Sequence, residues 1–498
     1  MSEDRRKQNF SLLLCLISSF LILLFCTKSS PLYPLNDWED ANIIFTVGRG
    51  ILDGKVPYRD LFDQKGPVAF FLYAIAALVS RKSFIGLFLL EVISFSAFLY
   101  YSDRTVSLSG CSQHALTIPV LGCLVASAMS FAHGGSVEEL LLPCYAYSLY
   151  AFLLFFRSPE SLTNGKFLLH GVLAGCIFWT KYTMTGFYIA WIAVLFFYRL
   201  SRKQWKTAFL SVLLFLAGMG IATVPWILYF TANNAMPDLI KYYFFNNIAG
   251  YSDTGSGNFL YMLLQIGKNT LATFFRNMRY SLLIVLGVLY YVIAPGKQAS
   301  FWDRAGLLAL CIFTCAGIYI GGTGYRYYGV ILACFACLGF IPILKFAERK
   351  FPGFNNVQSS WIPIILLLLC TGIAAVSNDN AYLLGKSKNS LPQYQFADTI
   401  RSSSSGTEKP VVLCYKMMDS GFYMTTGSEP DIRCFTWLNS ATKEIEREQK
   451  TALESGNVDF VITRNLHPDL SGYTIISEAS YYYEEANPIY YLYQRTAP

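Results

Sequence analysis

Residues 31–70 read PLYPLNDWEDANIIFTVGRGILDGKVPYRDLFDQKGPVAF and directly follow the first apolar segment of the chain. The stretch is dense in acids, bases, prolines and aromatics, a composition that the interior of a lipid bilayer does not tolerate. Ile43, Val47 and Ile51 recur at helical spacing within it. Gly54 then predicts the end of that helix. We therefore expect a polar loop at one side of a membrane, with one short helix inside it.

Three acids stand at the start of this predicted helix, namely Asp37, Glu39 and Asp40. The helix dipole favours charged carboxylates at that end, and Asp37 fits the N-cap position. A basic and aromatic turn follows the helix. Gly66 and Pro67 then open a second apolar helix, because proline is accepted at the first helical position. The sequence thus brings acids and bases to one face of the membrane.

This order of features resembles the first outer loop of GT-C glycosyltransferases. The branch it is similar to, glycosyltransferase family 39, includes protein O-mannosyltransferases, aminoarabinose transferases and bacterial relatives. In that branch the loop holds a catalytic acid followed by a Lys/His-(Pro/Gly)-Pro motif. Lys65, Gly66 and Pro67 match this motif, with glycine in place of the first proline. The resemblance is close over the loop and holds in outline elsewhere, and it implies a GT-C type membrane fold with the active site in loop 31–82.

The composition places the chain among polytopic membrane proteins. Its 498 residues are 54% hydrophobic and 14% charged, and the mean hydropathy is +0.39. The net charge of +7 is spread among loops without a recurring basic stripe, so no nucleic-acid partner is expected. Most cysteines lie in apolar runs as small hydrophobes. Cys414 and Cys434 lie in a polar region, where a disulfide and two free thiols are the alternatives.

About eleven membrane spans are predicted from length and hydropathy. They fall near residues 10–28, 83–102, 114–132, 140–156, 167–180, 183–198, 207–230, 280–294, 305–320, 327–344 and 360–376. Basic residues at 5–7 precede the first span without a cleavage site, which predicts an uncleaved anchor that begins in the cytoplasm. With this count the basic loops all face the cytoplasm, as the positive-inside rule requires. The segment 67–80 is short for a span, so we place it and much of 258–278 as helices at the outer interface.

The chain is predicted to consist of a membrane domain, residues 1–376, and a small extracytoplasmic α/β domain, residues 377–498. The second domain begins where the long apolar runs end. Its expected elements are apolar strands at 411–415, 460–463 and 489–495, a helix over 441–455 and a flexible loop at 402–406.

Sugar transfer from a polyprenyl phosphate needs a base for the acceptor hydroxyl, cations for the departing phosphate and a cavity open to lipid and water. The resemblance implies that an acid of the loop is the base. Asp40 is preferred, because an Asp followed by a small residue and Asn is similar to the pattern of bacterial relatives. Glu39 departs from that pattern and stays the alternative. Asp37 is either a structural cap or a substrate-binding residue.

Four cations are candidates for binding the donor phosphate: Lys65, Arg326, Lys181 and Arg59. Lys65 holds the position of the family Lys/His, and Arg326 precedes aromatics at the outer end of a late helix, where relatives carry His or Arg. A guanidinium binds phosphate through paired hydrogen bonds. The alternative for each is a side chain that reaches to the interface. Glu91, an acid inside a predicted span, is a secondary candidate that we expect to pair with a base.

The remaining candidates are substrate-binding residues. Tyr58, Tyr327 and Tyr328 would stack on a sugar or line the lipid groove, or they belong to an aromatic belt at the interface. Glu138 and Glu139 would bind acceptor hydroxyls, hold a divalent metal cation together with the loop acid, or serve as charges at a helix start. The metal cation is the one cofactor considered, and the resemblance does not require it.

The resemblance implies an inverting glycosyltransferase of the hexosyltransferase class in a bacterial cell membrane. Its partners would be membrane lipid, a sugar on polyprenyl (undecaprenyl) phosphate, and an extracytoplasmic acceptor such as a cell-wall glycan, a teichoic acid, a lipid-linked glycan or a protein. One alternative is a lipid-linked glycan polymerase or ligase with a diphosphate donor. Another is a transporter or flippase of polyprenyl-linked substrates, which the absence of clear internal repeats disfavours. The active-site face and the C-terminal domain are expected outside the cytoplasm.

Overall fold

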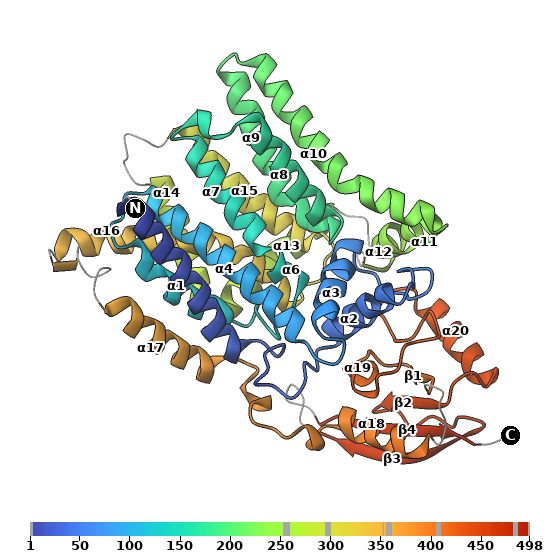
Figure 1. The fold of residues 1–498 in the computed structure, drawn as a ribbon. Coiled ribbons are helices and arrows are strands. Elements are labelled where there is room, and N and C mark those ends of the chain that lie inside the picture. The colour runs from blue at the N-terminus through green and yellow to red at the C-terminus, as the bar shows by residue number, and fades with distance from the viewer. Residues whose placement is uncertain are drawn as a thin grey trace. The chain divides into compact units, whose positions relative to one another are not determined.

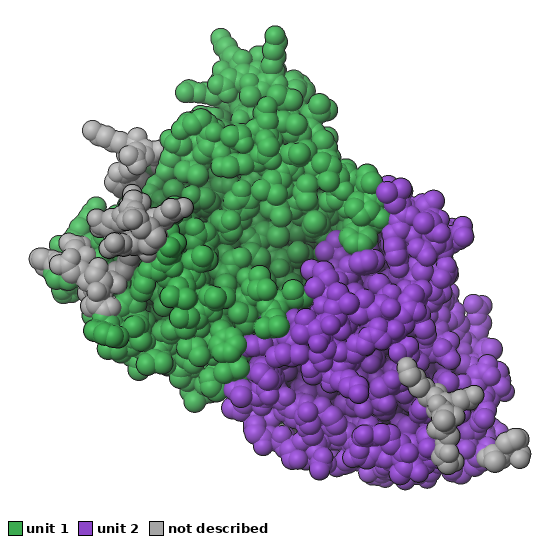
Figure 2. All heavy atoms as spheres, in the orientation of Figure 1, with its two compact units in different colours: residues 1–27, 89–226, 253–382 green, residues 28–88, 227–252, 383–498 purple. Residues whose placement is uncertain are grey.

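The computed structural model describes residues 3–251, 259–293, 300–351, 353–354, 361–404, 410–481 and 487–496. Over these residues the chain is mainly helical, with a four-stranded sheet near its C-terminal end (Figure 1). It packs into two compact units (Figure 2): unit 1, residues 1–27, 89–226 and 253–382, and unit 2, residues 28–88, 227–252 and 383–498. Packing thus groups the acidic loop with the C-terminal region. The predicted division at residue 376 is based on where the long apolar runs end, and it stays a prediction.

Long apolar helices make up most of unit 1, and α4, α10 and η7 also include residues of unit 2. The helices are α1 (Glu3–Cys26), α4 (Ile85–Leu108), η1 (His114–Leu116), α5 (Thr117–Ala126), α6 (Val137–Leu140), α7 (Leu142–Phe155), η2 (Pro159–Ser161), α8 (Asn164–Phe178), η3 (Tyr182–Thr185), α9 (Gly186–Ser201), α10 (Trp205–Ala232), α13 (Phe259–Arg276), α14 (Met278–Ile293), α15 (Phe301–Tyr319), η5 (Arg326–Gly339), α16 (Phe340–Lys350), α17 (Ile362–Ser377) and η7 (Ala381–Leu383). Each of the eleven predicted spans overlaps one or two helices in this list.

Seven segments of the described chain are long and apolar enough to cross a membrane, or eight if the bent pair α13 and α14 is one span. The seven are Gln8–Cys26, Ile85–Leu108, Val137–Phe155, Tyr182–Ser201, Trp205–Ala232, Phe301–Tyr319 and Arg326–Lys350. The other predicted spans, α5, α8 and α17, are shorter apolar helices. The 113° bend between α13 and α14 lies where the sequence separates an interfacial helix from a span. The chain is therefore a multi-pass membrane protein, while the number eleven stays a prediction.

Large apolar side chains point outward from these helices. On α10, Phe209, Leu213 and Leu228 are each at least 60% exposed. In water such a surface would drive aggregation, whereas lipid tails cover it without cost. The outward face of α10 is thus the face expected of a helix in a bilayer.

Unit 2 combines the acidic loop with the C-terminal α/β region. Its helices are α2 (Glu39–Leu52), α3 (Pro67–Val79), α11 (Met236–Leu239), the π-helix η4 (Ile240–Phe245), α12 (Asn246–Tyr251), η8 (Lys388–Ser390), α18 (Pro392–Ser403), α19 (Phe422–Thr426) and α20 (Thr442–Glu454). Helix α2 packs closely on α3, because a Cβ atom on Gly48 would lie 2.8 Å from the backbone nitrogen of Ala74. Helix α3 has 13 residues, about 20 Å at 1.5 Å per residue, which is too short to cross the hydrocarbon core as a straight helix.

The sheet of unit 2 has the strand order β1-β2-β4-β3 (Figure 1). Strand β1 (Val412–Cys414) pairs in parallel with β2 (Phe460–Arg464), and β4 (Ile489–Arg495) is antiparallel to both β2 and β3 (Tyr473–Ser480). The predictions of β1, β2, β4 and α20 are confirmed, whereas β3 was not predicted. It reads YTIISEAS, in which two isoleucines stand among threonine, serine and glutamate residues, and all of its residues are half-buried or exposed.

Two further expectations for this region concern the flexible loop at 402–406 and the pair Cys414 and Cys434. Residues 402–403 end helix α18, and residues 405–406 of the predicted flexible loop lie outside the described residues. Cys414 and Cys434 are both buried free thiols, so the disulfide alternative was wrong. Each thiol behaves as a small buried apolar group.

Candidate active site

The acidic loop enters α2 with a different cap from the predicted one. The helix begins at Glu39 and its N-cap is Trp38, without a capping side chain, so the prediction of Asp37 as N-cap was wrong. The turn is instead fixed by Asn36, whose Oδ1 accepts from the backbone N–H of Trp38 at 3.1 Å. The Asn42 side chain also donates to the carbonyl of Asn36 at 2.8 Å. These bonds free the Asp37 carboxylate for another role.

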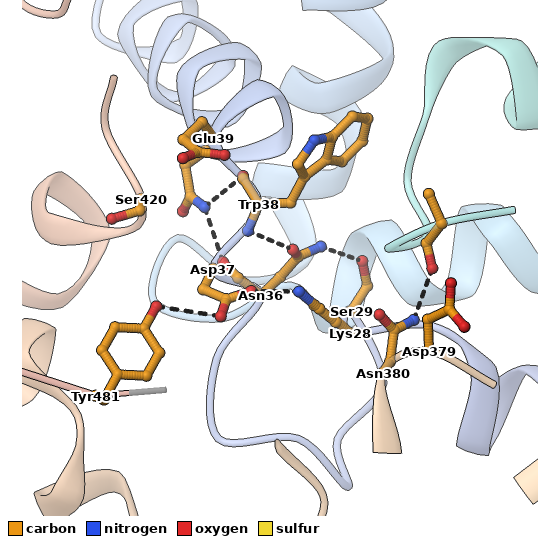
Figure 3. Close-up of polar contacts among 12 residues, drawn as sticks. Lys28, Ser29, Asn36, Asp37, Trp38, Glu39, Asp379, Asn380, Ser420 and Tyr481 are labelled. Carbon is orange, nitrogen blue, oxygen red and sulfur yellow. Dashed lines mark hydrogen bonds and ion pairs between the residues drawn. The ribbon is translucent and has the colours of Figure 1, made fainter. Parts of the chain in front are cut away.

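Asp37 belongs to a buried ion pair. Its Oδ1 lies 2.7 Å from Nζ of Lys28, and the two side chains are 1% and 0% exposed. Tyr481, just after β3, donates its hydroxyl to Oδ2 of the same carboxylate at 3.1 Å. Figure 3 shows the Asp37 side chain between these two partners. The geometry gives Asp37 a structural role, in place of the substrate contact that was considered.

Asp40 and Lys65 form a second ion pair that remains in contact with solvent. The distance between Oδ2 of Asp40 and Nζ of Lys65 is 3.0 Å, and the side chains are 16% and 14% exposed. The contact joins the first turn of α2 to the residue that precedes Gly66, the N-cap of α3. A carboxylate and an ammonium group from the two motifs of the sequence thus lie side by side.

Tyr58 is a buried residue that contacts the backbone of this loop at Lys65. It has the positive φ of 70° that few residues other than glycine adopt, and its hydroxyl donates to the backbone carbonyl of Lys65 at 2.6 Å. The ring packs against Phe70 and Phe230 and is fully buried. The position is unsuited to stacking on a sugar, so we revise the predicted role of Tyr58 to positioning Lys65.

Glu39, adjacent to Asp40, faces a different partner. Its Oε1 lies 2.7 Å from Nη1 of Arg464, the last residue of β2. Successive helical residues point about 100° apart, so neighbouring acids diverge. Glu39 and Asp40 are therefore paired with different cations, and Asp40 is the one that contacts the lysine of the motif.

Asp63 is an acid of the loop that sequence reasoning missed. It is 3% exposed, its Oδ1 accepts from the backbone N–H of Gln64 at 2.6 Å, and its Oδ2 has no hydrogen-bond partner among the described residues. Burial is the largest cause that raises the pKa of Asp63 to about 6; the Lys65 charge opposes this rise and the Asp40 charge adds to it. Its place two residues before Lys65 was the available signal.

Arg59 is largely engaged by its neighbour in the sequence. Its Nε and Nη2 donate to the two carboxylate oxygens of Asp60, both at 2.8 Å. Its Nη1 donates to the carbonyl of Asn233 at 2.7 Å. A phosphate would have to compete with this bidentate carboxylate, so Arg59 is the weakest of the four predicted phosphate ligands.

Unit 1 holds the other predicted cations and aromatics. Nζ of Lys181 lies 2.9 Å from Oε1 of Glu138 and 3.2 Å from the ring centroid of Tyr328. The Tyr327 ring lies 5.1 Å from that of Tyr328. Nη2 of Arg326 lies 3.8 Å from Oδ2 of Asp379. The structure thus gathers Lys181, Glu138 and the tyrosine pair into one cluster.

The two remaining acids of unit 1 are buried. Glu139 lies in the first turn of α6 and accepts from the backbone N–H of Gly135 at 2.9 Å, which confirms that Glu138 and Glu139 begin a helix. Glu91 on α4 is fully buried and accepts from the Thr27 hydroxyl at 2.8 Å. Glu91 also interacts with Glu139, so one partner of this acid is a second carboxyl group.

Over the part of the chain that the structure describes, no group of three or more His, Cys, Asp or Glu side chains is placed to hold a metal ion. Glu138 has Lys181 as its partner, and Asp40 has Lys65. The two acids considered for a shared cation, Glu138 and Asp40, are thus each paired with a lysine ammonium group.

Comparisons with known proteins agree with this architecture. No protein-family model and no curated protein matches the sequence. Among solved structures, ArnT from Cupriavidus metallidurans bound to undecaprenyl phosphate matches with a TM-score of 0.58 at 12% identity, over 96% of this chain and 97% of that chain. The chain has the GT-C fold.

The GT-C fold covers both the membrane helices and the C-terminal region, since the match extends over nearly the whole chain. The apo form of the same ArnT aligns with a TM-score of 0.45 at 11% identity, over 99% of this chain and 98% of that chain. The match with the TM-score of 0.58 confirms the predicted fold class. The roles of individual residues stay predictions, because a likeness at 12% identity carries the fold and no side chain.

Proposed function

We propose that this chain is a membrane glycosyltransferase that transfers a sugar from a polyprenyl phosphate to an acceptor outside the cytoplasm. The observation that carries the proposal is the Asp40–Lys65 pair, 3.0 Å apart and partly open to solvent, at the junction of two helices of a GT-C fold. An ionised carboxylate beside an ammonium group supplies a base and a phosphate ligand together. The ArnT structure of the same fold was solved with undecaprenyl phosphate, which supports that class of lipid.

The reaction assigns a separate task to each partner of the pair. Asp40 takes the proton of the acceptor hydroxyl while the acceptor oxygen forms a bond to C1 of the sugar. The bond from C1 to the phosphate oxygen breaks, and its electron pair leaves with the polyprenyl phosphate. Lys65 stabilises the charge on that phosphate. A single displacement of this kind inverts the anomeric centre, and a hexose is the proposed sugar.

Further roles rest on the sequence and are part of the proposal. Arg326 and Lys181 are proposed as additional phosphate ligands. Glu138, Tyr327 and Tyr328 are proposed to bind the sugar or the acceptor, and a divalent cation is an optional addition. The acceptor classes proposed are a cell-wall glycan, a teichoic acid, a lipid-linked glycan and a protein.

Transfer by the purified full chain tests the proposal. A panel of undecaprenyl phosphate sugars is offered to wild type, Asp40→Asn and the control Asp53→Asn, whose carboxylate forms an exposed pair with Arg81 at 2.8 Å. We expect wild type to consume one donor and Asp40→Asn to lose turnover by a factor of about one hundred or more, since a general base contributes that much. Asp53→Asn should keep its activity.

Other outcomes would change the assignment. Full activity in Asp40→Asn would transfer the role of base to Glu39 or Asp63. Turnover of diphosphate donors alone would indicate a polymerase or ligase. Movement of intact polyprenyl-linked sugars across vesicles, with no transfer, would indicate a transporter.

The orientation in the membrane is also a proposal. The positive-inside pattern of the loops supports an extracytoplasmic C-terminal region. Ser455 follows α20 and is exposed, and Ser201 at the end of α9 is exposed as well. A cysteine at 455 should react with an impermeant reagent in intact cells, and one at 201 should react only after permeabilisation. The reverse result would place the acidic loop in the cytoplasm.

A further inference from the structure

The C-terminal region contacts the start of α2 at both acids that flank Trp38. Arg464 of β2 pairs with Glu39 at 2.7 Å, and Tyr481 after β3 donates to Asp37 at 3.1 Å. The Tyr481 hydroxyl is itself held by Gln393 of α18, whose Nε2 lies 3.3 Å away. Two side chains of the C-terminal region, Arg464 and Tyr481, therefore hold the chain at the first turn of α2 and just before it.

Other contacts of unit 2 hold the same loop at a greater distance from the acids. Arg49, in the last turn of α2, is buried and donates to the carbonyl of Tyr423 at 3.2 Å. The backbone N–H of Phe62 donates to the carbonyl of Arg433 at 2.9 Å. A Cβ atom on Gly421 would lie 3.1 Å from the Leu35 side chain. The C-terminal region is thus packed against the loop along its length, and Arg464 acts on a firmly held helix start.

Without Arg464, the Glu39 carboxylate would lose its guanidinium partner, and its charge would stand next to Asp40 without that compensation. Two neighbouring carboxylates oppose each other's ionisation, and a Glu39 carboxylate released from Arg464 would compete with Asp40 for Lys65. The Arg464 guanidinium draws Glu39 toward the sheet and balances its charge. Asp40 then keeps its contact with Lys65, at 3.0 Å.

We infer that Arg464 is a positioning residue: it holds Glu39 away from the Asp40–Lys65 pair, so that the C-terminal region completes the catalytic unit. This inference rests on the proposed function. It also assigns the adjacent acids separate tasks, with Asp40 acting on the acceptor and Glu39 serving as the anchor for Arg464.

A double-mutant cycle with the active donor tests this role. Arg464→Met should lower kcat by roughly tenfold, with the KM for the donor little changed, because the loss arises at the reacting pair. Glu39→Gln removes the carboxylate that Arg464 pairs with, and the kcat of this single variant is the reference for the second change. In the Glu39→Gln background, Arg464→Met should therefore lower kcat by no more than about twofold.

Two controls separate this role from a general loss of structure. Arg464→Lys keeps the positive charge and should retain most of the activity, and it serves as the folded variant if Arg464→Met fails to fold. Arg401→Met removes an exposed arginine of α18 that pairs with Asp398, and it should behave as wild type.

The results distinguish two kinds of failure. If wild type is active and Arg464→Met loses the same activity in both backgrounds, or loses none, the positioning role is overturned and the proposed function stands. If wild type turns over no polyprenyl phosphate donor, the proposed function fails and takes this role with it.

Discussion

Two lysine–aspartate pairs of unit 2 differ in burial and not in chemistry. Lys28 and Asp37 lie 2.7 Å apart with side chains 0% and 1% exposed. Lys65 and Asp40 lie 3.0 Å apart with side chains 14% and 16% exposed. The first pair has a tyrosine hydroxyl as an added partner, and the second is partly exposed to solvent. The first pair leaves almost no exposed surface for a substrate, whereas the second leaves part of its surface exposed.

The comparison teaches that position relative to the helix start decides the role of each acid. Asp37 precedes the N-cap and turns into the protein, while Asp40 is the second residue of α2. Three residues thus separate a structural carboxylate from the proposed base. The same substitution made in both pairs should affect stability in one case and catalysis in the other.

The largest effect on stability is expected from Lys28→Met. The change leaves the Asp37 carboxylate buried without its cation, which costs about 3–5 kcal/mol. Thermal unfolding of the purified protein in detergent measures this loss. The control Lys450→Met breaks an exposed pair with Glu454 on α20 and should change stability by less than about 1 kcal/mol. If Lys28→Met unfolds at the same temperature as wild type, the buried pair makes no net contribution to the free energy of unfolding.

The matched change in the open pair, Lys65→Met, should act on catalysis. We expect kcat to fall by a factor of about one hundred, because a preorganised cation at the departing phosphate is lost. Unfolding should shift by less than about 1 kcal/mol, since the pair is partly hydrated. Initial rates and melting curves of the same preparation give both values. Loss of stability equal to that of Lys28→Met would remove the distinction between the pairs.

The sequence predicted the elements that local patterns encode. The helix that Gly54 ends, the short helix opened by Gly66 and Pro67, and the apolar strands β1, β2 and β4 follow from periodicity and from glycine and proline signals. Strand β3 was missed because polar residues flank its two isoleucines, and all of its residues are half-buried or exposed. Local patterns therefore gave most of the fold.

The candidate site was predictable only in part. Asp40 and Lys65 belong to recognisable motifs 25 residues apart, and their contact confirms that the loop brings acids and bases together. Arg464 and Tyr481 reach the same loop from more than 400 residues away. No local pattern specifies such a contact, because it is set by the packing of the sheet. The direction of the Asp37 side chain was missed for the same reason.

Asp63 provides the smallest test of the comparison, as a third carboxyl of the loop that is buried like Asp37 but has no cation in hydrogen-bond contact among the described residues. Burial raises its pKa to about 6, above the value of about 4 in an unfolded chain. Between these values the folded chain binds a proton that the unfolded chain has lost. The free energy of unfolding should therefore fall as the pH rises from 4 to 6.

Asp63→Asn lacks this titration, so its stability relative to wild type should rise with pH. The expected gain between pH 4 and pH 7 is about 2–3 kcal/mol, from a shift of about two pKa units. Melting curves of both proteins at a series of pH values measure the difference, with Asp53→Asn as the exposed control. A difference that is constant with pH would show that Asp63 is ionised in the folded chain and compensated by Lys65. In that case the Lys65 charge would balance both Asp40 and Asp63. The Asp40–Lys65 pair would then differ from the Lys28–Asp37 pair in the number of carboxylates per lysine as well as in burial.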